Sequence, residues 1–183
     1  RPAEALVHVV RAFDSPVVPH PLGSVDPARD ALNMEHELIF ADLFQAEKRL
    51  ERLEKDLKKI KNKELEAEHA LLVRLRGHLE EERPLRELTL TAEEERLVRG
   101  FTFLSQKPLL VVANLDEADV AHLGDVAAHC GLGDWCGRPA VVVTGVCGKI
   151  EAELAGLAPE EAREFMAELG IAEPGTARLL REN

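Results

Sequence analysis

Three short apolar runs, separated by long segments with helical patterns, constrain the fold of this chain most strongly. They cover residues 5–13, 109–113 and 139–144. The first is β-branched without strict alternation, which suits a strand buried on both faces of a parallel sheet, and the other two are also predicted as buried strands. Strands that alternate with helices predict an α/β fold. No glycine-rich turn follows the first run, so we expect a sheet that is incomplete on its N-terminal side.

A heptad pattern marks the region between the first two runs. Residues 29–82 favour helix, and their first apolar seam has spacings of three and four: Leu43, Ala46, Leu50, Leu53, Leu57 and Ile60. A second apolar face lies out of phase with it: Leu65, Leu72, Leu75 and Leu79. The polar break between the two seams predicts an antiparallel helical hairpin that turns at Asn62. The alternative is one continuous helix that dimerises.

Caps and breakers place the remaining helices. Thr91 and Glu94 have the spacing of a capping box, so we expect a helix from there to about residue 104. Pro159 with two following acids is a typical helix start. The further predicted helices cover residues 118–130, 149–154, 159–169 and 175–181.

Composition excludes several classes of protein. The formal net charge is −11, which disfavours non-specific binding of nucleic acid by the whole surface, and we expect no DNA partner. The longest apolar run, residues 109–113, is too short to span a membrane. Three irregularly spaced cysteines imply no disulfide framework and favour a reducing, cytoplasmic compartment. No paired spacing of cysteine or histidine predicts a metal site.

Polar turns follow the second and third apolar runs, where ligands bind in open α/β sheets. The first turn, residues 114–117, reads Asn-Leu-Asp-Glu. It resembles the Asn-Lys-x-Asp loop of GTPases, whose Asp accepts two N–H groups of guanine. Glu117 is one methylene longer, which should cost about 1–3 kcal/mol of discrimination for guanine. The alternative is a loop that only caps the following helix.

The second turn reads Cys-Gly-Lys and resembles the small turn whose backbone amides contact the base in GTPases. We therefore predict a nucleotide-binding site formed by both turns: Asn114, Leu115, Glu117, Cys147, Gly148 and Lys149. The sequence contains no Gly-x-x-x-x-Gly-Lys-[Ser/Thr] phosphate loop. Residues 134–137 match Asp-x-x-Gly but are interpreted as a turn. We therefore predict no catalytic residue here and no hydrolysis by this chain alone.

Several ordered segments share their motifs with one family. They are residues 25–30, 37–43, 103–109, 114–117, 149–154 and 165–170. Over nearly the whole chain the sequence resembles the YchF / Obg-like ATPase family. It departs from the family pattern at residues 33–36 and at Gly148, where the family commonly has Ala.

The resemblance implies a fold and a function. The fold is the C-terminal part of a P-loop GTPase-type parallel sheet with an inserted antiparallel coiled-coil hairpin. Residues 1–28 and 84–183 would form part of the nucleotide-binding domain, and residues 29–83 the insertion. Family members hydrolyse ATP, and some GTP, with Mg²⁺, and they associate with ribosomes. The phosphate loop and Mg²⁺ ligands are absent here, so we expect an internal segment of a longer protein.

The predicted hairpin tip is strongly basic. Around the single acid Asp56 it carries Lys55, Lys58, Lys59, Lys61 and Lys63. Such a cluster suits electrostatic contact with ribosomal RNA, although a solvated turn would look the same. The leading hypothesis is thus an ATPase or GTPase that acts with the ribosome. The alternative is a non-catalytic helical hairpin that binds protein or RNA.

Overall fold

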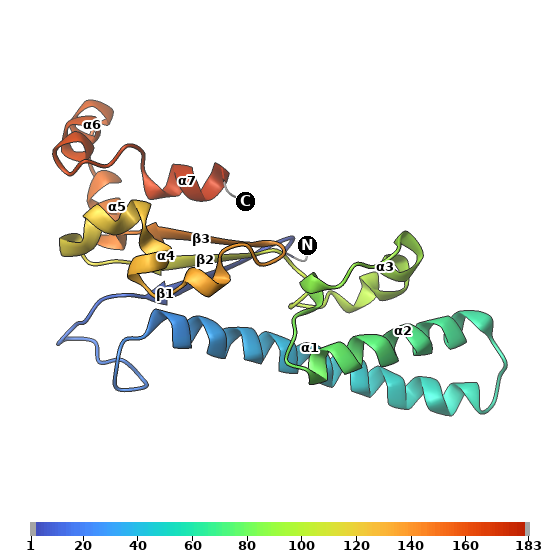
Figure 1. Ribbon diagram of the computed structural model, residues 1–183. Helices are drawn as coiled ribbons and strands as arrows, with labels where there is room; N and C mark the ends of the chain where they lie inside the picture. The colour runs from blue at the N-terminus through green and yellow to red at the C-terminus, as the bar shows by residue number, and fades with distance from the viewer. Residues whose placement is uncertain (1–2, 182–183) are drawn as a thin grey trace. The chain divides into compact units, whose positions relative to one another are not determined.

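Three parallel strands form a sheet in the order β1-β2-β3 (Figure 1). In the computed structural model, which describes residues 3–181, β1 is Leu6–Arg11, β2 is Leu109–Asn114 and β3 is Val141–Val146. The register aligns Arg11 with Asn114 and Asn114 with Val146, so all three strands end at one edge of the sheet. The predicted α/β class with a parallel sheet is confirmed.

Only the central strand is buried on both faces. β1 exposes Val7 at 54% and Val9 at 57%, and β3 exposes Val142 at 37%, whereas the first five residues of β2 are all buried. The prediction of buried strands is therefore wrong for one face of β1 and β3. Both are edge strands of the described sheet, and a β-branched composition does not distinguish an edge strand from a central one.

The other face of the sheet carries the core of this part of the chain. Val10, Val111 and Ala113 cluster there with Trp135 and with Ala31, near the start of α1. Because residues i and i+2 of a strand share a face, the alternate residues of each strand reach this core. The same packing places the ends of the strands, and hence the loops that follow them, at fixed positions.

The region after β2 differs from the predicted continuous helix over residues 118–130. A 3₁₀ helix, η3 (Glu117–Gly124), is followed by a short α-helix, α4 (Val126–His129). The two segments meet at Gly124 and Asp125, where φ of Asp125 is −122°, and glycine is a weak helix former. Gly131 ends this region with φ of +67°, as a helix-terminating glycine does.

The later elements match their predicted positions closely. They are α5 (Gly148–Leu154), α6 (Pro159–Glu168) and α7 (Gly175–Arg181). Residues 134–137, predicted as a turn, begin within a 3₁₀ helix, η4 (Gly133–Trp135), and continue as a turn in which Gly137 has φ of +81°.

Helices α1 (Pro27–Leu57) and α2 (Lys63–Glu80) form the predicted hairpin. Asn62 caps α2 by accepting a hydrogen bond from the backbone N–H of Glu64 at 2.8 Å. Arg49 of α1 donates two hydrogen bonds of 2.7 Å to the carboxylate of Glu68 on α2. The two seams supply the fully buried side chains between the helices: Ala46, Leu50, Leu53, Leu72, Leu75 and Leu79. The hairpin prediction is confirmed.

Ile60 does not belong to the seam, contrary to prediction. The helix ends at Leu57, and Ile60 is 62% exposed in the connection between the helices. The backbone N–H groups of Lys59 and Ile60 both bond to the carbonyl of Asp56, which closes the last turn of α1. The heptad spacing continues through Ile60, but the chain must already reverse direction there.

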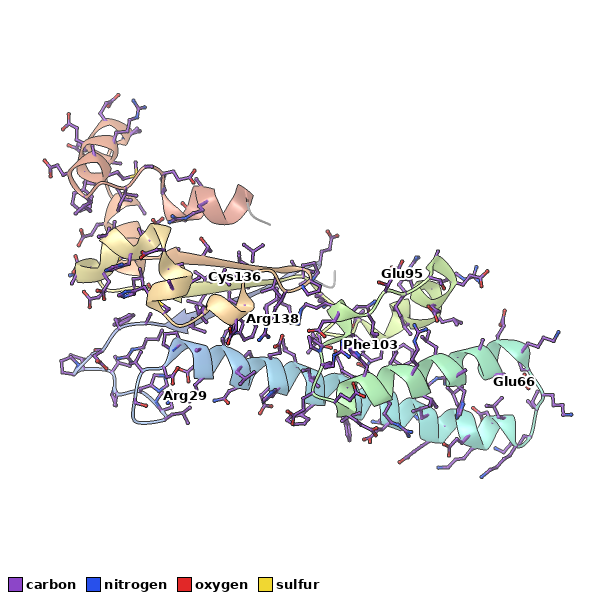
Figure 2. All side chains as sticks on the ribbon, in the orientation of Figure 1. Arg29, Glu66, Glu95, Phe103, Cys136 and Arg138 are labelled. Atoms are coloured by element: carbon purple, nitrogen blue, oxygen red, sulfur yellow. The ribbon has the colours of Figure 1, made fainter. Side chains whose placement is uncertain are left out.

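Residues 84–108 pack with the hairpin. They contain η1 (Leu85–Glu87), α3 (Ala92–Val98) and η2 (Arg99–Phe101). Thr91 and Glu94 form the predicted capping box, but the helix ends six residues before the predicted position of about 104. Phe103, labelled in Figure 2, is 1% exposed in the core of the helices.

Two compact units result. One comprises Leu32–Pro108 with the first described residues, and the other comprises Ala5–Ala31 and the chain from Leu109 onward. We refer to them as the helical unit and the sheet unit. The predicted division into a nucleotide-binding domain and a helical insertion of residues 29–83 stays a prediction.

A half-buried histidine in β1 should make the sheet unit sensitive to acid. Burial lowers the pKa of His8 below its usual 6.5, and the charge of Asp30 opposes this effect only partly. The folded state then binds the proton less readily than the unfolded state, so stability is complete above about pH 6.5 and falls as the pH drops below it. We expect His8→Val to lose less stability than the wild type between pH 7.5 and 5.5, measured by urea unfolding. Equal losses would contradict this.

Candidate functional site

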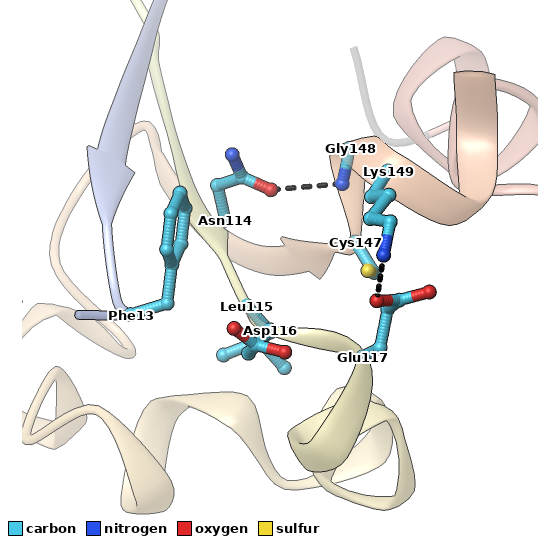
Figure 3. Close-up of a pocket in the computed structure, with 8 residues that line it drawn as sticks. All are labelled: Phe13, Asn114, Leu115, Asp116, Glu117, Cys147, Gly148 and Lys149. Carbon is cyan, nitrogen blue, oxygen red and sulfur yellow. Dashed lines mark hydrogen bonds and ion pairs between the residues drawn. The ribbon is translucent and has the colours of Figure 1, made fainter. Parts of the chain in front are cut away.

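Three loops meet at the edge where the strands end. The sheet pattern continues one residue further, since Ala12 N–H donates to the carbonyl of Asn114 at 2.9 Å and Leu115 N–H to that of Val146 at 2.7 Å. The loops enclose a pocket of about 210 Å³ (Figure 3). Its lining consists of Phe13, Asn114, Leu115, Asp116, Glu117, Cys147, Gly148 and Lys149.

All six residues of the predicted nucleotide site line this one pocket. Their role in binding a nucleotide stays a prediction. Phe13 also lines the pocket, and sequence reasoning missed it. One signal was available, because Phe13 ends the first apolar run and therefore lies at the same edge of the sheet, in a chain that is only 4% aromatic.

A side chain of the first turn holds the second turn in place. The backbone N–H of Gly148 donates to Oδ1 of Asn114 at 2.8 Å. A Cβ on Gly148 would lie only 3.2 Å from that oxygen, so glycine permits this close approach without displacing the amide. With Oδ1 engaged, the amide nitrogen of Asn114 is left as a donor for a ligand.

An ion pair links the same two turns on the solvent side of the pocket. Nζ of Lys149 contacts Oε2 of Glu117, and the two side chains are 66% and 41% exposed. The hydrogen bond to Glu117 raises the pKa of Lys149, so the ammonium stays charged. Because the pair is exposed, water screens it, and its contribution to the stability of the fold is small.

Asp116 is the residue of this loop that caps the following helix, η3. Its side chain accepts a hydrogen bond from the N–H of Ala118 at the start of η3, at 3.4 Å. Asn114 and Glu117 instead bond to Gly148 and Lys149 across the pocket. A loop that serves only to cap the next helix would not need these two side chains in the pocket.

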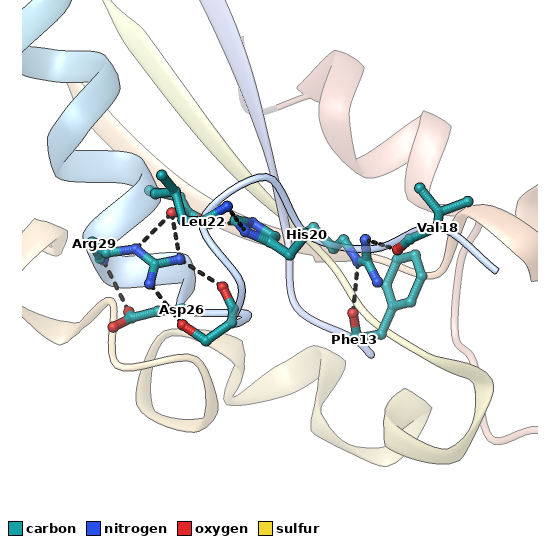
Figure 4. A network of polar contacts seen from close by, with 9 residues as sticks. Phe13, Val18, His20, Leu22, Asp26 and Arg29 are labelled. Carbon is teal, nitrogen blue, oxygen red and sulfur yellow. Dashed lines mark hydrogen bonds and ion pairs between the residues drawn. The ribbon is translucent and has the colours of Figure 1, made fainter. Parts of the chain in front are cut away.

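Phe13 is held by the last residue of β1 (Figure 4). Arg11 Nε donates to the carbonyl of Phe13 at 2.7 Å, and Nη1 donates to that of Val18 at 2.8 Å. The guanidinium carbon also lies 4.9 Å from the centre of the Phe13 ring. The ring is thus a fixed aromatic wall of the pocket, which suits stacking against a flat heterocycle.

The loop between Phe13 and α1 is fixed at its other end as well. Backbone N–H of Arg29 donates to Asp26 at 3.0 Å, and its guanidinium donates to Ser24 and Asp30. His20 also pairs with Asp30 at 2.9 Å. These contacts of the motif at residues 25–30 hold the polar loop over the start of α1 rather than contributing to the pocket.

The five predicted partner-binding lysines occupy the hairpin tip in the helical unit. They run from the last turn of α1, through the connection, to the first residue of α2: Lys55, Lys58, Lys59, Lys61 and Lys63. All are exposed, and none forms an ion pair with another of the described residues. Their charges therefore face solvent, together with the side chain of Ile60.

Neither a metal-binding cluster nor a membrane-spanning helix is found among the described residues. Within residues 3–181, no three His, Cys, Asp or Glu side chains are grouped so as to hold a metal ion. The sequence also lacks the phosphate-loop Ser or Thr that holds Mg²⁺ in P-loop nucleoside triphosphatases. Among the described helices, none is both long and apolar enough to cross a bilayer.

Comparisons with known proteins identify close relatives. No protein-family model matches the chain. The "Ribosome-binding ATPase YchF" of Bacillus subtilis is 38% identical over 181 residues, and that of Escherichia coli O157:H7 is 37% identical over 187 residues; each match covers 99% of this chain and 49% of the relative. "Obg-like ATPase 1" of rice is 29% identical over 175 residues, 94% of this chain and 44% of the relative.

One solved structure is similar in fold to this chain. The YchF GTPase of Schizosaccharomyces pombe matches with a TM-score of 0.74 and 27% identity, over 92% of this chain and 46% of that one. The chain therefore spans about half the length of the relatives that it matches.

Proposed function

Because this chain is similar over nearly its whole length to YchF and Obg-like ATPases, we propose that it supplies the base-recognition site and the helical arm of a nucleoside triphosphatase that acts with ribosomes. The pocket at the edge of the sheet carries this proposal. It combines an aromatic wall, an amide donor and a carboxylate, which are the groups that recognise a heterocyclic base.

Each group has a distinct task in the proposed site. Phe13 stacks against the base, the amide nitrogen of Asn114 donates to a ring acceptor, and Glu117 accepts an N–H of the base edge. The volume of about 210 Å³ is below the roughly 300–1,000 Å³ of pockets that enclose whole drug-sized ligands. The pocket therefore suits the base, while the phosphates extend beyond it.

Hydrolysis requires groups that this chain does not provide. Phosphoryl transfer depends on a loop that holds the phosphates and on Mg²⁺, which neutralises developing charge. The sequence has no Gly-x-x-x-x-Gly-Lys-[Ser/Thr] phosphate loop. We assign hydrolysis of ATP or GTP to a longer protein that contains this chain. Two valines exposed on one face of β1, Val7 and Val9, support further elements packing there.

The helical unit is proposed to be the arm that reaches the ribosome. Its basic tip offers five exposed lysines on a chain with a net charge of −11, so the positive charge is local. Relatives are named as ribosome-binding. The positive charges of these lysines would attract the phosphate groups of ribosomal RNA. A non-catalytic hairpin module would account for the arm but not for the pocket.

Titration with ATP tests the base site. In the ¹⁵N-labelled chain, ATP should shift the amide signal of Gly148 and of its neighbours in the pocket. Asn114→Ala removes both the donor and the anchor of Gly148, so the apparent Kd should rise about tenfold, equivalent to about 1.4 kcal/mol. Asn62→Ala, the same substitution at the hairpin turn, is the matched control and should bind normally. ATP shifts confined to residues outside the pocket, or none at all, would rule out the proposed site.

A further inference from the structure

Adenine and guanine differ in the number of donors along the edge that a carboxylate can read. Guanine presents two adjacent donors, N1–H and the N2 amino group, and needs two acceptor oxygens to satisfy them. Adenine presents one amino group, on N6, beside an acceptor nitrogen. A carboxylate with both oxygens available therefore suits guanine, whereas one available oxygen is enough for adenine.

Glu117 has one of its oxygens engaged before any ligand arrives. Oε2 contacts Nζ of Lys149, while Oε1 has no hydrogen-bond partner among the described residues. The combined group therefore offers one oxygen with both lone pairs free, a second oxygen that already accepts from the ammonium, and spare N–H donors on the ammonium. That pattern complements the donor and acceptor of adenine, whereas the second donor of guanine meets only the oxygen that already accepts from the ammonium.

We propose that Lys149 is a specificity-determining residue, which favours adenine over guanine by occupying one oxygen of Glu117. This inference rests on the proposed base site and adds to it the determinant of base choice. The length of Glu117 alone changes the reach of the carboxylate, whereas Lys149 changes how many acceptors it presents.

The geometry keeps Lys149 in this position. It follows Gly148, whose N–H is fixed at 2.8 Å from Oδ1 of Asn114, and it lies in the first turn of α5. Lys149 and Glu117 thus project from two turns that are already joined by a hydrogen bond. Glu117 also raises the pKa of Lys149, so the lysine retains its charge at neutral pH.

AMP and GMP provide the test, since they differ only in the base and any contact with the phosphate cancels in the ratio of their Kd values. Both would be titrated into the ¹⁵N-labelled chain. Lys149→Met keeps the apolar stem and removes the ammonium, so the preference should move towards GMP by about two- to fivefold, the range expected for an exposed ion pair. Lys149→Arg keeps the charge and should retain the wild-type ratio.

A double-substitution cycle separates this role from a structural one. When Glu117→Ala is already present, Lys149→Met should leave the AMP-to-GMP ratio unchanged, because no carboxylate remains to be occupied. If the wild type binds AMP at the pocket but Lys149→Met leaves the ratio unchanged, the inference is wrong and the base site stands. If neither nucleotide shifts signals in the pocket, both the site and the inference fail.

Discussion

Replacing Asp42 with alanine should lower the free energy of unfolding by about 3–5 kcal/mol, as expected for breaking a buried charged network. Asp42 lies on α1 and is 1% exposed. Its carboxylate accepts the backbone N–H of Leu104 at 2.8 Å, and both the N–H and the hydroxyl of Ser105 at 2.7 Å. Alanine would leave three donors without their acceptor in the core of the helical unit.

The environment of Asp42 explains why burying its carboxylate costs free energy and why replacing it would still destabilise the fold. Burial raises its pKa, and the hydrogen bonds from Ser105 and Leu104 oppose that rise. Asn would fit the space, but its amide nitrogen would face N–H donors, so Asp42→Asn should also be destabilising. The carboxylate is needed because only it accepts from every donor at once.

Urea unfolding followed by circular dichroism would measure the effect of Asp42→Ala. Glu47→Ala serves as the control, since it removes an exposed carboxylate from the same helix and should change stability by less than about 0.5 kcal/mol. A loss below about 1 kcal/mol for Asp42→Ala would show that water or a rearranged loop satisfies the three donors.

Reversing the charge of Lys58, Lys59 and Lys61 to glutamate should greatly reduce co-sedimentation of this chain with bacterial ribosomes. All three are exposed at the hairpin tip. Each lysine that neutralises a phosphate releases a counterion, which contributes about 0.7–0.9 to the slope of log K against log salt. The triple variant should therefore flatten that slope by about 2–3 and lose at least about tenfold in affinity at low salt.

The control must match the change in net charge. Arg96, Arg99 and Arg163 are exposed and lie away from the tip in sequence. Replacing these three with glutamate alters the net charge of the chain equally. Similar losses in both triple variants would indicate a general effect of charge. Unchanged co-sedimentation of the lysine variant would rule out the tip as the contact.

Local patterns in the sequence predicted the hairpin, the capping box and the strand positions well. A heptad seam and a cap depend on residues a few positions apart, and those relations hold in any helix. Prediction failed where neighbours outside the segment decide the outcome. Ile60 has seam spacing but lies where the chain reverses, and β1 has a buried composition but lies at the edge of the described sheet.

The sequence by itself determined that two polar turns follow buried strands and that the first reads Asn-Leu-Asp-Glu. The order and register of the strands determined which other residues join these turns in the pocket. They align Arg11, Asn114 and Val146, which brings Phe13 to the pocket from the far end of the chain and sets Lys149 against Glu117. Periodicity is local, whereas such contacts depend on how distant strands pair. The base pocket could therefore be predicted from two motifs, but its aromatic wall and its ion pair required the tertiary structure.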